Sequence, residues 1–380
     1  MMRTLVQLST GLLTILAAST VLLLADLDGR VGEQRRAGAD SRRPHIAIVQ
    51  HATIDPLDEG VRGVLAALKE RGFVEGETID IDAFNAQGDV ATSNTIAKEV
   101  TAKNYDVIVT SSTISLQTVA NANRFGDPPR LHLFGLTSNP FEAGVGVDAE
   151  DPFLHPPYMA GLGSLPPVHE LFDLLKEIHP ELDRVGLVWN PAEANSEAAT
   201  RLARDAAARL GITLVDGNAE SSTAAGEVAA SVLARGVDVL WISTDITVST
   251  AADVMIEAAR RARVPVVTSL PGTAERGALI DLGSSFFEIG VEQGRLVADV
   301  LEGRSPASIP VLNWTPDTLH INLDALEGLR DPWVLPADLL ARASTVIEND
   351  RVDRRDVPLP APPAALAWDR SARQEGGGSL

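Results

Sequence analysis

Short apolar runs alternate with amphipathic stretches along the first part of the chain. Residues 45–50 form an apolar run typical of a buried strand, and residues 57–70 follow with apolar side chains at helical spacing. The predicted strands are residues 45–50, 79–84, 105–110 and 131–135, and the predicted helices are residues 57–70, 90–103 and 114–123. Strands and helices that alternate in this way predict a parallel sheet with helices on both faces.

A second series of the same kind follows residues 137–167, which are rich in Pro, Gly and His and which we interpret as a crossing between domains. Its predicted strands are residues 184–189, 212–215, 237–242, 264–267 and 278–281, and its predicted helices are residues 168–178, 197–210, 223–234 and 251–263. A helix at 287–301, a strand at 319–323 and a short helix at 337–348 complete the pattern. The sequence therefore predicts an α/β protein of two doubly wound parallel-sheet lobes, joined by several crossings around a cleft.

The same pattern predicts the domain boundaries. The predicted segments are a signal peptide or signal anchor at 1–25, a linker at 26–44, a first lobe at 45–140 plus about 284–309, a second lobe at about 141–283 plus 310–348, and a tail at 349–380. The linker is rich in Arg, Gly and Asp, and the tail is rich in Pro and Ala before it ends in Gly-Gly-Gly-Ser-Leu. Because such compositions bury little apolar surface, we expect the tail to be disordered.

The first segment is mostly apolar. Residues 5–24 are long enough to span a bilayer, and Arg3 before them suits a secretory signal. No small-x-small cleavage site follows Leu24, which favours an uncleaved anchor. Several arginines follow the span, however, and by the positive-inside rule they would place the body of the protein in the cytoplasm.

Composition and charge narrow the range of functions. The formal net charge of −20 argues against a nucleic-acid partner, since nucleic acid is bound by basic surfaces. The absence of cysteine excludes disulfides, thiolate catalysis and cysteine zinc sites. The sequence also lacks the P-loop, HExxH and GxSxG motifs, so we expect no catalytic residue, no metal and no cofactor.

The loop after the strand at 184–189 is the first functional candidate. Asn190-Pro191 ends that strand, and Asn195 or Ser196 is predicted to cap the following helix. A polar loop at the carboxyl end of a strand, beside a helix N-terminus, is where open α/β sheets bind small ligands, and it favours anionic groups. For any single loop of this kind, ordinary capping remains the simpler explanation.

Similar polar loops are predicted at the carboxyl ends of five other strands. Their hydroxyl, amide and carboxylate groups can hydrogen-bond a zwitterion or another small polar solute without reacting with it. The candidate ligand-binding residues on the six loops are Thr53, Asp55, Ser111, Ser112, Thr113, Thr137, Asn139, Glu193, Asn195, Ser196, Thr244, Asp245 and Thr268. Because caps and turns favour the same residue types, each candidate also has a purely structural explanation.

Three stretches carry a resemblance to a known family. They are residues 185–196 with Asn-Pro-Ala-Glu-Ala-Asn-Ser, residues 241–245 with Trp-Ile-Ser-Thr-Asp, and residues 283–310 with Phe-Phe-Glu-Ile-Gly and Gln-Gly-Arg. On these motifs, residues 45–348 resemble the TrpX-like substrate-binding proteins of ABC transporters, which have the type I periplasmic-binding-protein fold. The resemblance implies a solute receptor without enzymatic activity, whose two lobes are joined by a multi-strand hinge.

The resemblance also implies a set of ligand contacts. Carried over by position, these fall near Thr53, Ser111, Ser112, Thr137, Asn195, Ser196 and Asp245. Two departures concern the ligand: Ile246 stands where an Asn often follows the aspartate, and Asn139-Pro140 stands where Asp-Pro is common. The resemblance therefore indicates a binding site of the family type, with its own ligand preference.

Because the family resemblance outweighs the arginine count, we expect an extracytoplasmic solute-binding protein of an ABC transporter, exported or N-terminally anchored at the periplasmic or extracellular face of the cytoplasmic membrane. A small polar solute, an amino acid or similar, would be captured between the lobes by hinge closure, and the closed monomer would dock on a membrane permease. The alternative is a ligand-sensing domain of the same fold that signals to a membrane partner. An α/β enzyme would need a phosphate cradle or a poised acid/base pair, and the sequence shows neither.

Overall fold

The computed structural model describes residues 42–368. The account below concerns the compact unit that begins at residue 44. The expected signal peptide or anchor at 1–25 and nearly all of the expected linker lie outside the described residues. Within residues 42–368, no helix is both long and apolar enough to cross a membrane.

The first sheet has six strands, all paired in parallel, in the order β11-β5-β4-β3-β1-β2. Its strands are β1 His45–Gln50, β2 Asp80–Asn85, β3 Val107–Ser111, β4 His132–Thr137, β5 Met159–Gly163 and β11 Leu312–Asn313. Its helices are α2 Asp55–Glu70, α3 Val90–Ala102, α4 Thr113–Asn123 and α10 Phe286–Leu301. The central strands β3 and β4 are buried throughout, as a parallel sheet covered on both faces requires.

The second sheet has eight strands in the order β14-β13-β12-β10-β9-β8-β6-β7. Its strands are β6 Arg184–Trp189, β7 Thr213–Asn218, β8 Val239–Ile242, β9 Val266–Thr268, β10 Ile280–Ser284, β12 Asp317–Asn322, β13 Thr345–Glu348 and β14 Arg351–Arg354. Its helices are α5 Val168–Ile178, α6 Ala194–Leu210, α7 Ser222–Ala234, α8 Ile246–Thr250, α9 Ala252–Ala262 and α11 Ala337–Arg342. The sheet is mixed rather than wholly parallel as predicted, because β12 and β14 run antiparallel to β10 and β13.

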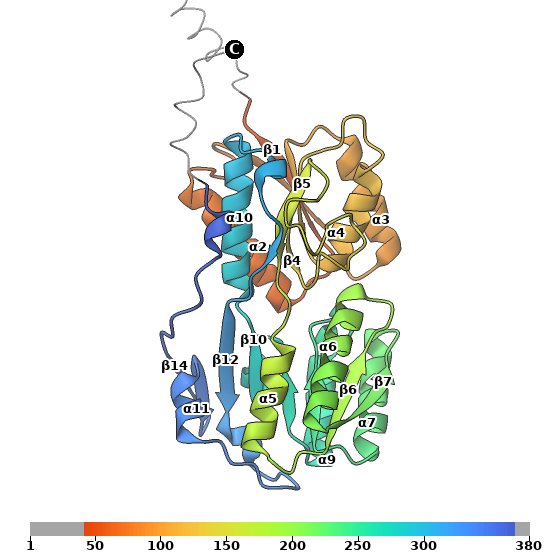
Figure 1. Ribbon diagram of the computed structural model, residues 1–380, viewed down its shortest axis with the longest axis vertical. Coiled ribbons are helices and arrows are strands. Elements are labelled where there is room, and N and C mark those ends of the chain that lie inside the picture. Colours follow the sequence, from red (N-terminus) through yellow and green to blue (C-terminus); the bar gives the residue numbers. More distant parts are fainter. Residues whose placement is uncertain (1–41, 369–380) are drawn as a thin grey trace, which may run out of the picture. The chain divides into compact units, whose positions relative to one another are not determined.

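Three segments connect the two sheets. Residues 164–167 lead from β5 to α5, Ser285 leads from β10 to α10, and residues 314–316 lead from β11 to β12. Figure 1 shows the two sheets, each with helices beside it, and the connecting segments between them. We call the first sheet with its helices the first lobe, the second sheet with its helices the second lobe, and the three segments the hinge.

The strands β5 and β11 fall in ranges that the predicted boundaries assign to the second lobe, yet both pair in the first sheet. The segment interpreted as a crossing thus contains a strand. Its sequence, Met-Ala-Gly-Leu-Gly, carries no β-branched or aromatic signal. The glycine is required there, because a Cβ on Gly161 would lie 2.1 Å from the carbonyl oxygen of Phe134. The exact lobe boundaries stay a prediction.

Two predictions about local structure are wrong. The helix α6 begins at Ala194, so Asn195 and Ser196 lie in its first turn and neither is its cap. The predicted helix at 337–348 is the short helix α11 followed by the strand β13.

Part of the expected disordered tail is folded. Residues 349–368 contain the strand β14, which forms a hairpin with β13 through Asn349 and Asp350. Both turn residues have positive φ, 55° and 58°, as a two-residue hairpin turn of type I′ requires. Asn and Asp tolerate this conformation better than other non-glycine residues, so the turn has a local cause in the sequence.

Candidate functional site

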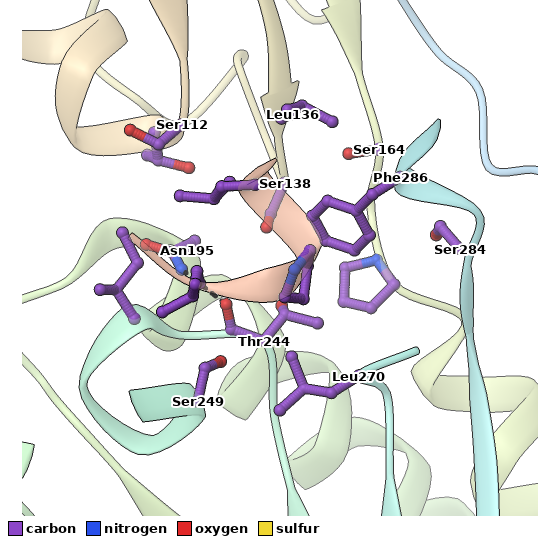
Figure 2. Close-up of a pocket in the computed structure, with 16 residues that line it drawn as sticks. Ser112, Leu136, Ser138, Ser164, Asn195, Thr244, Ser249, Leu270, Ser284 and Phe286 are labelled. Atoms are coloured by element: carbon purple, nitrogen blue, oxygen red, sulfur yellow. Dashed lines mark hydrogen bonds between the residues drawn. The ribbon is translucent and has the colours of Figure 1, made fainter. Parts of the chain in front are cut away.

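A pocket lies between the two lobes, at the carboxyl ends of strands from both sheets (Figure 2). Its cavity volume is about 30 Å³, room for roughly two water molecules. We call it the cleft pocket. It is lined by Ile54, Pro56, Leu57, Ser112, Thr113, Leu136, Ser138, Ser164, Pro166, Asn195, Thr244, Ile246, Ser249, Leu270, Ser284 and Phe286.

Half of the residues that line the cleft pocket are apolar and half are polar, and none of them is ionisable. The apolar lining comes from Ile54, Pro56, Leu57, Leu136, Pro166, Ile246, Leu270 and Phe286. The polar lining comes from Ser112, Thr113, Ser138, Ser164, Asn195, Thr244, Ser249 and Ser284. A pocket of this composition can surround an apolar group and hydrogen-bond a polar one, but it offers no side-chain counter-charge.

Four helices of at least 11 residues begin at the cleft pocket. Leu57 lies in the first turn of α2, Thr113 is the first residue of α4, Asn195 lies in the first turn of α6, and Phe286 is the first residue of α10. The first backbone N–H groups of a helix have no partner within it, and the helix dipole is positive at that end. Both effects favour an anionic group such as a carboxylate in the cleft pocket.

Three polar side-chain atoms of the second lobe are buried at the pocket without a partner. Among the described residues, no hydrogen-bond partner lies within reach of Asn195 Oδ1, Thr244 Oγ1 or Ser249 Oγ. Asn195 and Ser249 are only 5% and 8% exposed, so solvent has little access to them. Figure 2 shows them opposite Ser112, Leu136 and Phe286. A buried polar atom without a partner costs about 1–3 kcal/mol, and a ligand in the pocket would supply the missing bonds.

Two buried carboxylates lie behind these three side chains, which we call the second-lobe wall of the pocket, and they hold α8 in place. Glu193 accepts hydrogen bonds from the backbone N–H groups of Ile246, at 2.8 Å, and Thr247, at 3.0 Å. Asp245 caps the helix, since one oxygen accepts from the N–H of Val248 at 2.8 Å and the other from the Ser196 hydroxyl at 2.7 Å. Burial, together with the nearby Glu193, raises the pKa of Asp245 to about 7. These residues position the pocket wall without lining the pocket.

Four of the thirteen predicted residues line the cleft pocket together: Ser112, Thr113, Asn195 and Thr244. The other nine do not line it: Thr53, Asp55, Ser111, Thr137, Asn139, Glu193, Ser196, Asp245 and Thr268. Several have local roles. The Thr53 hydroxyl, for example, accepts from Asn85 Nδ2 at 3.1 Å, and the Asn139 side chain accepts from the N–H of Phe141 at 3.2 Å. A part for these nine in binding stays a prediction.

The sequence interpretation missed the apolar wall. It chose polar residues on the six loops, whereas Ile54, Leu136 and Ile246 sit beside those residues on the same loops and also face the pocket. Phe286 lies within a motif of the family resemblance, which was the only signal for it. Ser164 gave no signal, because it lies on a hinge segment whose path depends on the unpredicted strand β5.

Comparison with known proteins identifies the family. A family model described as ABC transporter substrate binding protein matches residues 45–347. The chain belongs to this family. Among curated proteins, the tyrosine-binding protein of Clostridioides difficile (strain R20291) is 27% identical over 325 residues, which cover 85% of this chain and 92% of that protein.

Solved structures agree with the family assignment. A conserved domain protein from Vibrio cholerae is 31% identical, with a TM-score of 0.74, and the match covers 80% of this chain and 100% of that one. An ABC domain in complex with L-Trp from Streptococcus pneumonia is 22% identical, with the same TM-score and the same coverage, and it supports the fold alone. The predicted fold class, two α/β lobes of the periplasmic-binding-protein type, is confirmed, and so is the role of a substrate-binding protein of ABC transporters.

Proposed function

We propose that this substrate-binding protein captures an amino acid with no net charge and an apolar or aromatic side chain in the cleft pocket, and presents it to an ABC permease. The observation that carries the proposal is the set of lining residues of the pocket, which are apolar and polar in equal number and include no ionisable side chain. The name of one similar protein, the tyrosine-binding protein of Clostridioides difficile, supports a ligand of this class.

The polar lining residues suit the two charged groups of a zwitterion. The α-carboxylate would lie at the helix N-termini, where Ser112 and Thr113 begin α4 and offer hydroxyl groups. The α-ammonium would donate to the unpartnered oxygens of Asn195, Thr244 and Ser249. The Glu193 carboxylate behind these side chains adds negative potential on the same side.

The apolar lining residues suit the side chain of the ligand. Leu57, Leu136 and Phe286 present aliphatic and aromatic surface from the first lobe, and Leu270 does so from the second. A Lys, Arg, Asp or Glu side chain would place a further charge against this surface without a counter-charge, which is strongly unfavourable. The pocket is therefore expected to select against charged amino acids.

Binding requires the lobes to move. A cavity of about 30 Å³ is far smaller than the ligand pockets of about 300 Å³ or more that enclose small organic molecules. The lobes must therefore separate at the hinge before a solute enters. Because both lobes contribute lining residues, the ligand makes its full set of contacts only when they close again, and binding shifts the population toward the closed state.

The proposal extends to the setting of the protein. It acts as a monomer outside the cytoplasm, exported or held by its N-terminal segment, and docks on its permease without catalysing a reaction. It needs no metal or cofactor for this role.

Thermal-shift and calorimetric titration of the purified full chain against the common amino acids test the proposal. We expect stabilisation by aliphatic and aromatic amino acids, and none by Asp, Glu, Lys or Arg. The variant Asn195→Ala removes one ligand acceptor and should raise Kd about 10-fold or more, the value of a hydrogen bond to a charged group. Asn94→Ala, at an exposed position on α3 outside the cleft pocket, is the matched control and should leave Kd unchanged. Equal binding of charged amino acids, or no binding across the panel, would contradict the proposal.

A further inference from the structure

The segment that follows β14 leaves the second lobe. After β14 it runs back to the first lobe, as the dark blue segment of Figure 1 shows. Leu366 is 2% exposed and belongs to the same apolar core as Leu296 and Val297 of α10. Arg304, itself 6% exposed, donates from Nη1 to the carbonyl oxygen of Leu366 at 2.7 Å. This end of the segment is thus anchored in the first lobe.

The other end of the segment is held by the second lobe. The backbone N–H of Arg355 donates to the carbonyl oxygen of Ser344 at 2.8 Å, and its guanidinium donates to that of Leu340 at 2.7 Å. The hairpin turn before it is also fixed, since the N–H groups of Asn349 and Asp350 both donate to the Asp324 carboxylate, at 2.7 and 2.9 Å. Residues 355–366 therefore join two fixed points, one on each lobe, and we call them the C-terminal strut.

The strut is stiff by composition. Between its anchors stand four prolines, Pro358, Pro360, Pro362 and Pro363. Proline fixes φ, and proline-rich chains act as semi-rigid extended spacers of about 3.1 Å per residue, so the eight steps from Arg355 to Pro363 span about 25 Å. The last three residues, Ala364–Leu366, form the short 3-10 helix η4 at the first-lobe anchor. Such a spacer resists changes in the distance between its ends more than a flexible linker does.

The strut lies on one side of the hinge, and much of the second-lobe wall of the cleft pocket lies on the other. In the second sheet, β13 and β14 lie beyond β12 at one edge, whereas the strands that lead into α6 and α8 lie on the other side of β10. Two of the three hinge segments leave the sheet from β10 and β12, between these two groups, and the third leads into α5. A rotation that opens the cleft on the α6 side therefore changes the distance between the anchors of the strut.

We propose that the C-terminal strut limits how far the lobes open and thereby strengthens ligand binding. A restricted open state has less conformational freedom to lose when the lobes close, which lowers Kd. The strut would be a fourth connection between the lobes, beyond residue 347, where the match to the family model ends. The inference rests on the hinge closure proposed above.

The distance between the lobes can be measured directly, because the chain contains no cysteine. Asn121→Cys on α4 and Asp205→Cys on α6 place two spin labels at exposed positions, one on each lobe. Pulsed electron paramagnetic resonance on the full chain without ligand then reports the range of openings. In this doubly labelled protein we expect Leu366→Asp, which removes the first-lobe anchor of the strut, to shift the distribution of label-to-label distances to longer values. The matched control Ala365→Asp adds the same charge at an exposed position and should leave it unchanged.

A second variant separates the strut from simple core stability. Replacing the four prolines by serine keeps both anchors and removes the stiffness, so the melting temperature should hold while the ligand-free distances lengthen. In calorimetry both strut variants should raise Kd for an amino acid that binds, by roughly 3- to 10-fold. Distributions identical to the parent in both variants would overturn the strut proposal even if the parent binds amino acids. Failure of the parent to bind any amino acid overturns the proposed ligand instead, while the ligand-free distances still decide on the strut.

Discussion

At the scale of single residues, the second-lobe wall of the cleft pocket contains two kinds of side chain: some face the pocket, and others hold the backbone behind them. Asn195 and Ser249 present unpartnered polar atoms to the pocket, while Glu193 and Asp245 hold the backbone of α8 from behind. Asp245 is fully buried and close to the second carboxylate, and these two features raise its pKa to about 7. The contribution of the Asp245 carboxyl to the stability of the fold therefore depends on pH.

The pH dependence of stability tests this account of Asp245. In the unfolded chain its carboxyl titrates near the ordinary aspartate value of 3.8, so between about pH 4 and 7 the unfolded chain has lost a proton that the folded chain still binds. The contribution of this group to stability therefore falls as pH rises through that window and stays low above it. Asn is uncharged and also caps helices well, so Asp245→Asn should gain stability relative to the parent as pH rises.

Thermal unfolding at about pH 5 and about pH 8 checks the prediction. The melting temperature of Asp245→Asn minus that of the parent should be more positive at the higher pH, by about 2–4 °C for each kcal/mol. The control Asp205→Asn, at an exposed carboxylate on α6, should show no such change. A difference for Asp245→Asn that is the same at both pH values would count against a buried, high-pKa carboxyl.

These residues also show how far the sequence could predict the site. Asn195 and Asp245 both stand in polar loops at the carboxyl ends of strands, so both were predicted as ligand contacts. Only the structure shows that the side chain of Asp245 turns back to cap α8 while Asn195 faces the pocket. Composition and spacing locate such loops along the chain, but the direction of each side chain depends on tertiary packing.

At the scale of elements, the helices α2 and α10 set one wall of the cleft pocket through a close crossing. A Cβ on Gly290 would lie 1.9 Å from the carbonyl oxygen of Gly60, and one on Gly63 would lie 2.1 Å from that of Phe287. The two backbones therefore meet where only glycine fits. This contact fixes where the first turns of both helices, with Leu57 and Phe286, stand in the pocket.

We expect Gly290→Ala to destabilise the protein by about 1–3 kcal/mol or more, because the added methyl group must push two backbones apart. The free energy of unfolding, from urea titration, measures this. Gly226→Ala in α7 is the matched control: its Cβ would meet only Val254, at 3.4 Å, so the replacement should stabilise the helix by about 0.5–1 kcal/mol. Equal effects of the two substitutions would show that the crossing is looser than described.

The elements differ in how well the sequence predicted them. The alternating strands and helices of both lobes carry strong periodic signals, so strands such as β1 and β6 were predicted at their observed bounds. The strand β5 was missed because three of its five residues are Ala or Gly and none is β-branched or aromatic, and β14 was missed because it lies in a segment whose composition resembles a linker. The secondary-structure propensity of a segment does not predict its conformation where contacts with a neighbouring element determine it.

At the scale of the whole molecule, one ion pair joins the lobes at the cleft away from the strut. Arg201 on α6 of the second lobe donates from Nη2 to both carboxylate oxygens of Glu142, on the loop between β4 and β5 of the first lobe. Both side chains are nearly half exposed, 48% and 43%. The pair requires closed lobes, so it favours the closed state, but an exposed pair contributes only about 0–1 kcal/mol.

Arg201→Gln should therefore raise the Kd for a bound amino acid by no more than about 5-fold, mainly through faster dissociation, because the lost contact belongs to the closed state. The effect should shrink at about 0.5 M salt, where exposed charges are screened. Arg209→Gln on the same helix is the matched control, since Arg209 pairs with Asp173 at 2.8 Å within the second lobe. Calorimetry and stopped-flow dissociation at low and high salt measure these effects. If the two substitutions change Kd equally, the contribution of Arg201 is general surface charge, and the Glu142 pair does not bias closure.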